Sequence, residues 1–214
     1  FQPCRIRTRL TGLSSRKITP LMARQLRLVF MGTPYFAVPS LQRLHESGYA
    51  IAGVVTAPYK PAGRGQKLKE SAVKQYARSQ GFPILQPDNL KDPGFQQALA
   101  ALEPDLQVVV AFRKLPQAVW QLPPYGTFNL HASLLPDYRG AAPIHWALIN
   151  GERQTGVTTF FMNNRIDAGT LIQQERVPIA EDETAGSLHD KLMEQGADLV
   201  KQTVDAIADG TAVP

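Results

Sequence analysis

The sequence predicts an α/β fold, a doubly wound and mostly parallel sheet with helices on both of its faces. Short apolar runs with the character of strands alternate with helical patterns along the first half of the chain. The strand runs are 26–31, 50–55, 83–85 and 106–111, and the helical patterns are 36–48, 71–80 and 93–103. Such alternation is typical of βαβ units. The run 106–111 is apolar almost throughout, as expected of a strand buried on both faces at the centre of a parallel sheet.

The first strand and the first helix are defined by their ends. Gly32, Thr33 and Pro34 terminate the strand, and the helix that follows stops at Gly48. A dinucleotide-binding version of this fold needs the pattern G-x-G-x-x-G at this turn. This chain has one glycine there, and a proline where the backbone would approach a pyrophosphate. We therefore expect no bound NAD.

The second half of the chain shows a change of pattern. An apolar run ends at Asn129 and His131, and residues 157–162 and 171–177 read as paired strands around a turn. A long helix is predicted over 184–208. Parallel α/β sheets bind ligands outside the carboxyl ends of their strands, so Asn129 and His131 lie where a ligand is expected.

The chain is predicted to contain one domain, residues 22–209, because an apolar content of 43% is enough for one sizeable core. Residues 1–21 are Arg-rich and lack acids, a composition that fits an organelle transit peptide. Met22 stands just before the first strand, which favours instead an extension that is not part of the native fold. Residues 210–214 read as the start of a linker.

Charge is distributed unevenly along the chain. The formal net charge is +5, yet residues 1–27 hold seven Lys and Arg and no acid, so subtracting seven leaves −2 for residues 28–214. The overall charge therefore does not by itself indicate a nucleic-acid-binding surface. A single cysteine, Cys4, excludes a disulfide framework. No apolar run approaches the ~20 residues that cross a membrane.

Asn129, His131 and Asp167 are the candidate catalytic residues. Asn129 and His131 stand two residues apart on a strand, so their side chains point to the same face. An amide, an imidazole and a carboxylate together can transfer an acyl-type group without a covalent enzyme intermediate. Asn129 can donate a hydrogen bond to a tetrahedral oxyanion, and protonated His131 can stabilise it further. Asp167 can orient the imidazole and favour its charged form.

The other histidines indicate no metal site. His45 and His189 lie on predicted helices and read as surface or boundary residues, and His145 at a helix start reads as structural. No two histidines have the spacing of zinc ligands with an acidic neighbour, so we expect no metal.

One segment is strongly basic. The loop after the second strand, APYKPAGRGQKLK, contains Lys60, Arg64, Lys67 and Lys69. On its charge alone it is a solvated surface insertion. Its glycines, prolines and bases also make it mobile and electropositive, which suits phosphate contacts that order on binding.

Six segments together resemble the folate-dependent formyltransferases. They are Leu28–Pro34 (LVFMGTP), Pro61–Gly65 (PAGRG), Asn129–Pro136 (NLHASLLP), Arg139–Ile144 (RGAAPI), Thr155–Thr158 (TGVT) and Asp167–Gly169 (DAG). The resemblance covers about residues 26–214. The Asn-x-His pair and the aspartate alone indicate only the superfamily. With the other segments, the chain is similar to the branch that formylates initiator methionyl-tRNA.

The resemblance implies transfer of a formyl group from 10-formyltetrahydrofolate to the amino group of initiator methionyl-tRNA. It implies that Ser133, Leu134, Leu135 and Pro136 pack on the folate, with main-chain groups contacting the pteridine. It also implies that the basic loop contacts the acceptor end of the tRNA, with Arg64 the foremost residue. The bacterial cytoplasm is the expected location, and an organelle is the lesser alternative.

The chain also departs from the family pattern. Phe112-Arg113-Lys114-Leu115-Pro116 stands where the family usually shows a Tyr-Gly pair, so one wall of the folate pocket is expected to differ. Asp137-Tyr138 replaces a more basic-aromatic pair. The family carries a C-terminal β-barrel that helps to hold tRNA, and these 214 residues end before it. Two alternatives stay open: another folate formyltransferase or a 10-formyltetrahydrofolate hydrolase, and a folate- or tRNA-binding fragment without useful turnover.

Overall fold

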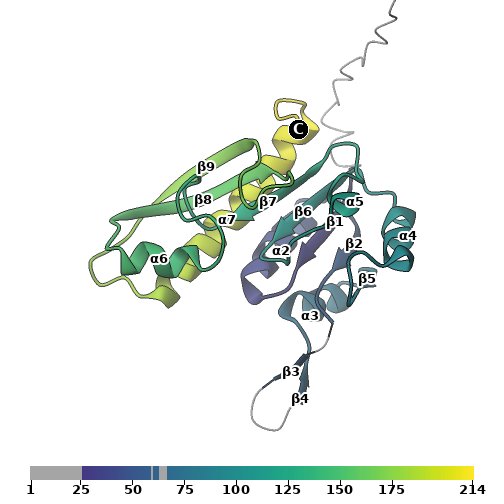
Figure 1. The fold of residues 1–214 in the computed structure, drawn as a ribbon, viewed down its shortest axis with the longest axis horizontal. Coiled ribbons are helices and arrows are strands. Elements are labelled where there is room, and N and C mark those ends of the chain that lie inside the picture. Colours follow the sequence, from purple (N-terminus) through teal and green to yellow (C-terminus); the bar gives the residue numbers. More distant parts are fainter. Residues whose placement is uncertain (1–25, 59, 63–66) are drawn as a thin grey trace, which may run out of the picture.

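The computed structural model describes residues 26–58, 60–62 and 67–214, with side chains over 26–58 and 70–214 (Figure 1). The predicted extension, residues 1–21, lies outside the described residues, and so does Arg64 of the basic loop. The described residues therefore begin directly before the first strand and contain nearly all of the predicted domain.

A seven-stranded sheet forms the centre of the fold, in the order β5-β2-β1-β6-β7-β8-β9. Its strands are β1 (Arg27–Gly32), β2 (Ala50–Val55), β5 (Ile84–Leu85), β6 (Leu106–Val110), β7 (Thr127–His131), β8 (Gln154–Phe161) and β9 (Leu171–Pro178). The first five of these pair in parallel, whereas β8 and β9 pair antiparallel. The mostly parallel α/β fold predicted from the sequence is thus confirmed, and so is the pairing of the last two strands.

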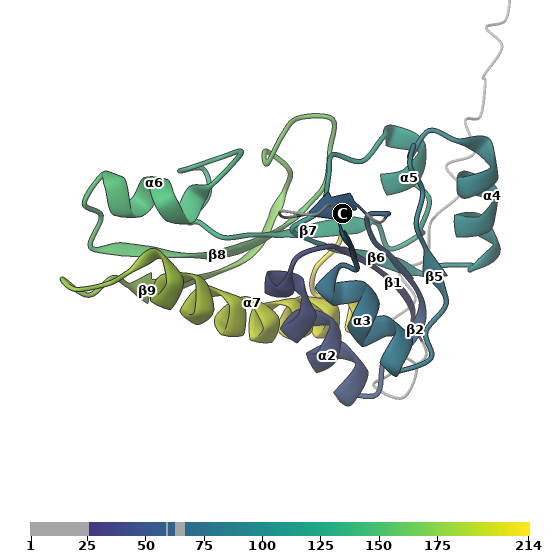
Figure 2. The ribbon, with the colours of Figure 1, turned by 90° about the horizontal axis from the view of Figure 1, so that it is seen from below.

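Helices cover both faces of this sheet (Figure 2). They are η1 (Tyr35–Ala37), α2 (Val38–Glu46), α3 (Ala72–Ser79), α4 (Pro93–Ala101), α5 (Gln117–Trp120), α6 (Pro143–Ile149) and α7 (Ala185–Ala208). In β1, Leu28 and Phe30 point into the core shared with α2, α3 and α7, whereas Val29 and Met31 point into the core under α4 and α5. None of the described helices is long and apolar enough to cross a membrane.

The basic segment differs from the irregular loop that the sequence predicts. Lys60–Ala62 (β3) and Lys67–Lys69 (β4) pair antiparallel, with Lys60 opposite Lys69. The pair projects away from the main sheet (Figure 1). The prediction of a loop is wrong for these residues, because a backbone that leaves the sheet still needs hydrogen-bond partners and these two segments supply them to each other.

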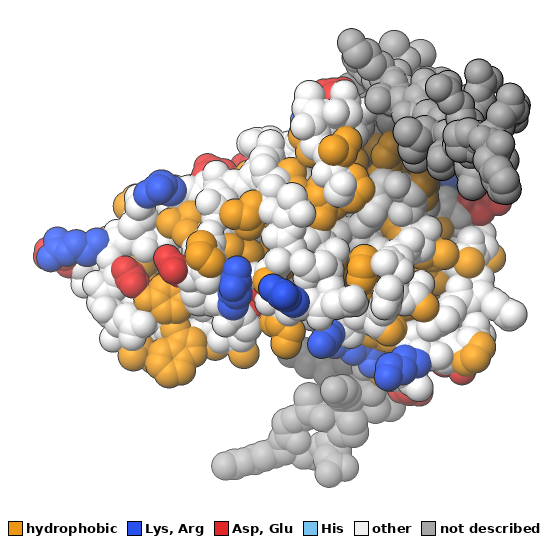
Figure 3. Space-filling model, turned by 45° about the horizontal axis from the view of Figure 1, so that its top comes forward, with side chains coloured by type: hydrophobic (Ala, Val, Ile, Leu, Met, Phe, Trp, Pro, Cys, Tyr) orange, Lys and Arg blue, Asp and Glu red, His pale blue; other side chains and the backbone are white. Residues whose placement is uncertain are grey.

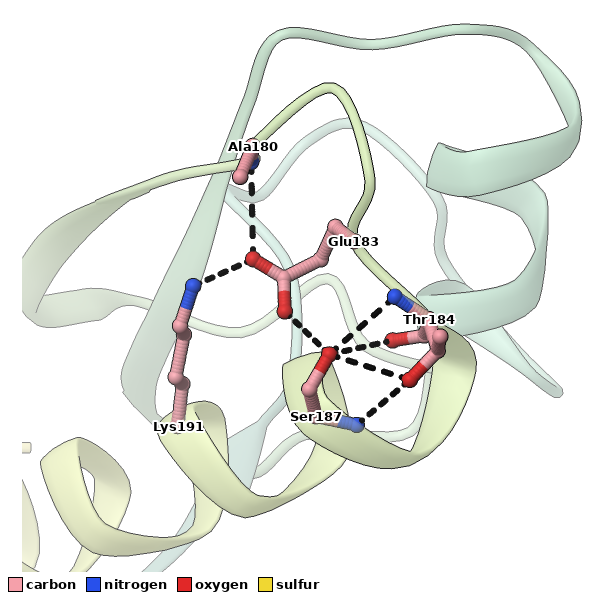
Figure 4. A network of polar contacts seen from close by, with 5 residues as sticks. All are labelled: Ala180, Glu183, Thr184, Ser187 and Lys191. Carbon is pink, nitrogen blue, oxygen red and sulfur yellow. Dashed lines mark hydrogen bonds and ion pairs between the residues drawn. The ribbon is translucent and has the colours of Figure 1, made fainter.

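A network of polar groups fixes the start of α7 (Figure 4). The Thr184 hydroxyl accepts from the Ser187 backbone N–H at 3.1 Å, and the Ser187 hydroxyl accepts from the Thr184 backbone N–H at 3.1 Å. This reciprocal pair is a capping box. Lys191 and the Ser187 hydroxyl donate to the Glu183 carboxylate and lower its pKa. The first turns of α7, which carry His189 to the functional site, therefore have a defined position.

Candidate active site

Asn129 and His131 lie at the carboxyl end of β7, as the sequence predicts. The β7 strand is paired on one side with β6 and on the other with β8, so its backbone is held by both neighbours. His131 is 7% exposed and lies opposite Thr158 of β8. Both side chains line one cavity, which agrees with the prediction that they point to the same face.

Asp167 reaches this strand end from the loop that joins β8 to β9, residues 162–170. A side chain at Gly169 would place its Cβ 1.6 Å from the Phe161 carbonyl oxygen, so only glycine allows the loop to lie against that carbonyl. The Asp167 carboxylate accepts from the Gly140 backbone N–H at 2.9 Å, and its carbonyl accepts from Arg139 Nε at 2.9 Å. The two motifs Arg139-Gly140 and Asp167-Ala168-Gly169 thus hold each other in place.

The imidazole of His131 lies between two acceptors. Its Nε2 is 2.8 Å from the Tyr138 carbonyl oxygen, and its Nδ1 is 3.8 Å from Asp167 Oδ2. Because a carbonyl can only accept, Nε2 carries a proton. Nδ1 then faces the carboxylate, and a second proton there gives an ion pair. The two nitrogens of His131 therefore face groups from different loops, the Tyr138 carbonyl and the Asp167 carboxylate.

Two cavities meet at these residues. The first, of about 500 Å³, is lined mainly by residues 112–117 and 162–167. The second, of about 440 Å³, is lined mainly by residues 129–132 and 142–145. Asn129 and Asp167 line both cavities, and His131 lines the second. The three predicted catalytic residues are therefore brought together where the two cavities adjoin.

The first cavity has apolar walls and a basic rim. Leu115, Trp120 and Met162 are among its apolar residues. Arg113, Lys114 and Arg165 also line it, and all three are exposed. On the face drawn in Figure 3, Lys and Arg side chains lie in a band beside exposed hydrophobic side chains. A cavity of this kind suits a flat, partly apolar ligand that carries negative charge at one end.

Ser133, Leu134, Leu135 and Pro136 lie on neither of these two cavities. The carbonyls of Ser133, Leu134 and Leu135 and the Leu135 N–H have partners inside the protein, and Thr158 of β8 binds two of these groups. Its buried hydroxyl donates to the Ser133 carbonyl at 2.6 Å and accepts from the Leu135 backbone N–H at 3.2 Å. Leu134 packs over Gly156, where a Cβ would come within 2.5 Å of the leucine side chain. That these four residues contact folate directly stays a prediction.

Two histidines to which the sequence assigns no function also line the site. His145 and His189, read as structural or boundary residues, both line the second cavity, where His189 also packs edge-on against Phe36. His45 packs against Phe82 outside both cavities. No sequence signal links His145 and His189 to Asn129, because α6 and α7 reach the site only through the tertiary fold.

The predicted nucleic-acid-binding residues are only partly described. Lys60 begins β3, and Lys67 and Lys69 begin and end β4, whereas Arg64 lies outside the described residues. Within the described part of the chain, no three His, Cys, Asp or Glu side chains gather as metal ligands would.

Comparison with known proteins shows the family of the chain. Residues 26–204 match the family model of the formyl transferases, so the chain belongs to the formyl transferase family. It is 59% identical over 189 residues to the methionyl-tRNA formyltransferase of Bacteroides thetaiotaomicron, covering 88% of this chain and 59% of that protein. It is 56% identical over 191 residues to the enzyme of the same name from Flavobacterium psychrophilum, covering 89% and 60%. The chain thus spans about three fifths of the length of these relatives.

Solved structures of lower identity share the fold. The phosphoribosylglycinamide formyltransferase of Streptococcus pneumoniae superposes with a TM-score of 0.71 at 19% identity, covering 85% of this chain and 98% of that one. A formyltetrahydrofolate deformylase from Pseudomonas syringae pv. tomato gives a TM-score of 0.70 at 19% identity, covering 86% and 62%. At such identities the likeness concerns the arrangement of strands and helices.

We expect Thr158→Val to destabilise the protein by about 2 kcal/mol, because it leaves the buried Leu135 N–H and the Gln174 amide without their hydroxyl partner. Urea unfolding measures this loss. Thr155→Val is the matched control, since the Thr155 hydroxyl is buried on the same strand and hydrogen-bonds to none of the described residues. An equal loss in both variants would contradict the assigned role of Thr158.

Proposed function

We propose that this chain transfers a formyl group from 10-formyltetrahydrofolate to the amino group of initiator methionyl-tRNA. The observation that carries the proposal is the junction of two cavities at Asn129, His131 and Asp167. A group transfer without a covalent enzyme intermediate needs donor and acceptor bound at once, one on each side of the catalytic residues.

The first cavity is assigned to the folate. Trp120 and Met162 offer apolar surface for a flat ring system, and Arg113, Lys114 and Arg165 complement the carboxylates of a folate. The segment 112–117 keeps its place because Arg113 donates to the carbonyls of Pro87 and Asp88. The formyl group of the donor then lies toward Asn129 and Asp167, which belong to both cavities.

The second cavity is assigned to the amine acceptor. The acceptor nitrogen attacks the formyl carbon, and a tetrahedral intermediate with an anionic oxygen forms. The amide of Asn129 donates a hydrogen bond to that oxygen, and protonated His131 stabilises it electrostatically. As the intermediate collapses, the bond to the folate N10 breaks, and the His131–Asp167 pair carries a proton from the attacking amine to that nitrogen.

The network around Thr158 supports an indirect role for Ser133–Pro136. Its hydrogen bonds hold the turn after His131, and the Ser133 hydroxyl donates to the Asp137 carbonyl at 2.6 Å. We propose that this segment acts on the folate site chiefly by fixing residues 137–140, which lead to His131 and Asp167. Direct contact of Ser133–Pro136 with the folate is the alternative that a folate complex would reveal.

We propose that the basic segment receives the acceptor end of the tRNA. Lys60, Lys67 and Lys69 stand on the projecting pair of strands, and Arg64 belongs to the segment between them. A small acceptor would have no use for such a projection. Residues 22–209 are proposed as the catalytic unit, acting in a bacterial cytoplasm.

Formylation of initiator methionyl-tRNA by the purified chain with 10-formyltetrahydrofolate tests the proposal. We expect transfer to the tRNA, loss of that transfer in His131→Ala, and an unchanged circular dichroism spectrum in the variant. Glycinamide ribonucleotide, a sugar-nucleotide amine and water are the competing acceptors. Transfer to one of these in place of the tRNA would identify a different folate enzyme, and near-normal activity of His131→Ala would contradict the catalytic assignment.

Arg64→Ala is expected to raise the KM for methionyl-tRNA about tenfold and to leave folate binding unchanged, because one phosphate contact is lost. In a plot of log affinity for tRNA against log salt concentration, the slope should become shallower by about one. Lys201→Ala is the control, because it also removes one positive charge. Lys201 pairs with Asp205 near the carboxyl end of α7. An equal loss of tRNA and folate binding in Arg64→Ala would mean that the segment does not contact tRNA.

A further inference from the structure

Tyr138 contacts His131 through its main chain. The Tyr138 carbonyl oxygen is 2.8 Å from His131 Nε2 and accepts its hydrogen. In a neutral imidazole only one nitrogen carries hydrogen, so this bond selects the tautomer in which Nδ1 is free to accept a proton. Nδ1 is the nitrogen that faces Asp167. The position of one carbonyl thus decides which nitrogen of His131 exchanges a proton.

The backbone of Tyr138 is in a conformation that needs support. Its φ is +55°, in the left-handed region, which costs a non-glycine residue free energy. The support comes from its own side chain. The Tyr138 hydroxyl donates to Glu152 Oε1 at 2.5 Å and accepts from Asn150 Nδ2 at 3.0 Å. The Glu152 contact raises the pKa of the hydroxyl, which therefore stays protonated and donating at neutral pH.

Asn150 and Glu152 directly follow α6, whose first residues line the second cavity. The end of α6 is itself fixed, because the Asn150 N–H donates to the Trp146 carbonyl at 3.0 Å and the Glu152 N–H to the Ala147 carbonyl at 3.0 Å. Hydrogen bonds therefore tie the Tyr138 hydroxyl to the end of α6 and the Tyr138 carbonyl to His131, and the covalent frame of Tyr138 joins the two.

We propose that Tyr138 is a positioning residue for formyl transfer, because its carbonyl fixes the tautomer of His131. The hydrogen bonds of Glu152 and Asn150 to the Tyr138 hydroxyl in turn fix the position of that carbonyl. The inference rests on the proposed function for its consequence in the reaction, and on the hydrogen bonds alone for its consequence in the imidazole. Tyr138 touches no reacting atom. It acts by keeping Nδ1 beside Asp167 as the site of proton exchange.

The test is Tyr138→Phe, which keeps the carbonyl and the aromatic ring and removes only the hydroxyl. Nitrogen-15 NMR of the histidine side chains reports the protonated nitrogen of His131, and the signal is assigned by its loss in His131→Asn. We expect the Nε2-protonated form to dominate in the unmodified chain and a mixture of both tautomers in Tyr138→Phe. We expect kcat to fall about tenfold with the KM for folate unchanged, since a small misplacement of a catalytic group is enough for such a loss.

Two further variants sharpen the result. Tyr125→Phe makes the same chemical change just before the amino end of β7 and should leave both the tautomer and kcat unchanged. Glu152→Gln keeps an acceptor for the hydroxyl and should retain more activity than Tyr138→Phe. A Tyr138→Phe protein that loses thermal stability while its tautomer and kcat stay those of the unmodified chain would overturn the proposal.

The two measurements test the proposed function and the positioning role of Tyr138 separately. If the unmodified chain does not formylate methionyl-tRNA, the proposed function fails, and the NMR comparison still decides whether Tyr138 positions His131. An unmodified chain in which His131 carries its hydrogen on Nδ1 would overturn the positioning role whatever the acceptor.

Discussion

The site depends on the close approach of Gly169 to the Phe161 carbonyl. Phe161, the last residue of β8, pairs with Phe128 near the amino end of β7, whereas His131 lies at the carboxyl end of the same strand. The loop 162–170 must therefore turn back across the sheet to bring Asp167 to His131. With a Cβ at Gly169 this path is closed. The same return path places residues 162–167 opposite residues 112–117, and the first cavity is the space between them.

Several residues near the site have a left-handed backbone conformation. Among the described residues, five non-glycine residues have positive φ, and four of them border the site: Ala111, Tyr138, Ala142 and Asp167. Such conformations persist only where the surroundings over-determine them. At Tyr138 and Asp167 the surroundings include hydrogen bonds that join separate motifs, as in the bond between the Asp167 carboxylate and the Gly140 N–H. At these two residues, the hydrogen bonds that hold the strained backbone also fix the geometry around His131.

Much of the fold follows from local patterns, and the site follows only in part. Strand and helix alternation predicts the parallel sheet, and the apolar repeat predicts α7 to within a residue of its observed start. The two-residue spacing of Asn129 and His131 predicts their common face. The strands β3 and β4 escape prediction because no apolar pattern marks them. His189 and the Thr158 network escape it as well, because their partners are distant in sequence and meet only through packing.

The central claim is that Asp167 acts through His131 at the junction of the two cavities. Single-turnover formyl transfer from 10-formyltetrahydrofolate to initiator methionyl-tRNA, by the unmodified chain and by Asp167→Asn, tests it most directly. Asparagine keeps an oxygen for the Gly140 N–H and loses the charge. The account predicts a rate about 10²–10⁴ times lower, with folate binding retained. A rate within about twofold of the unmodified chain, far less than the loss expected when the charge beside His131 is removed, would contradict it.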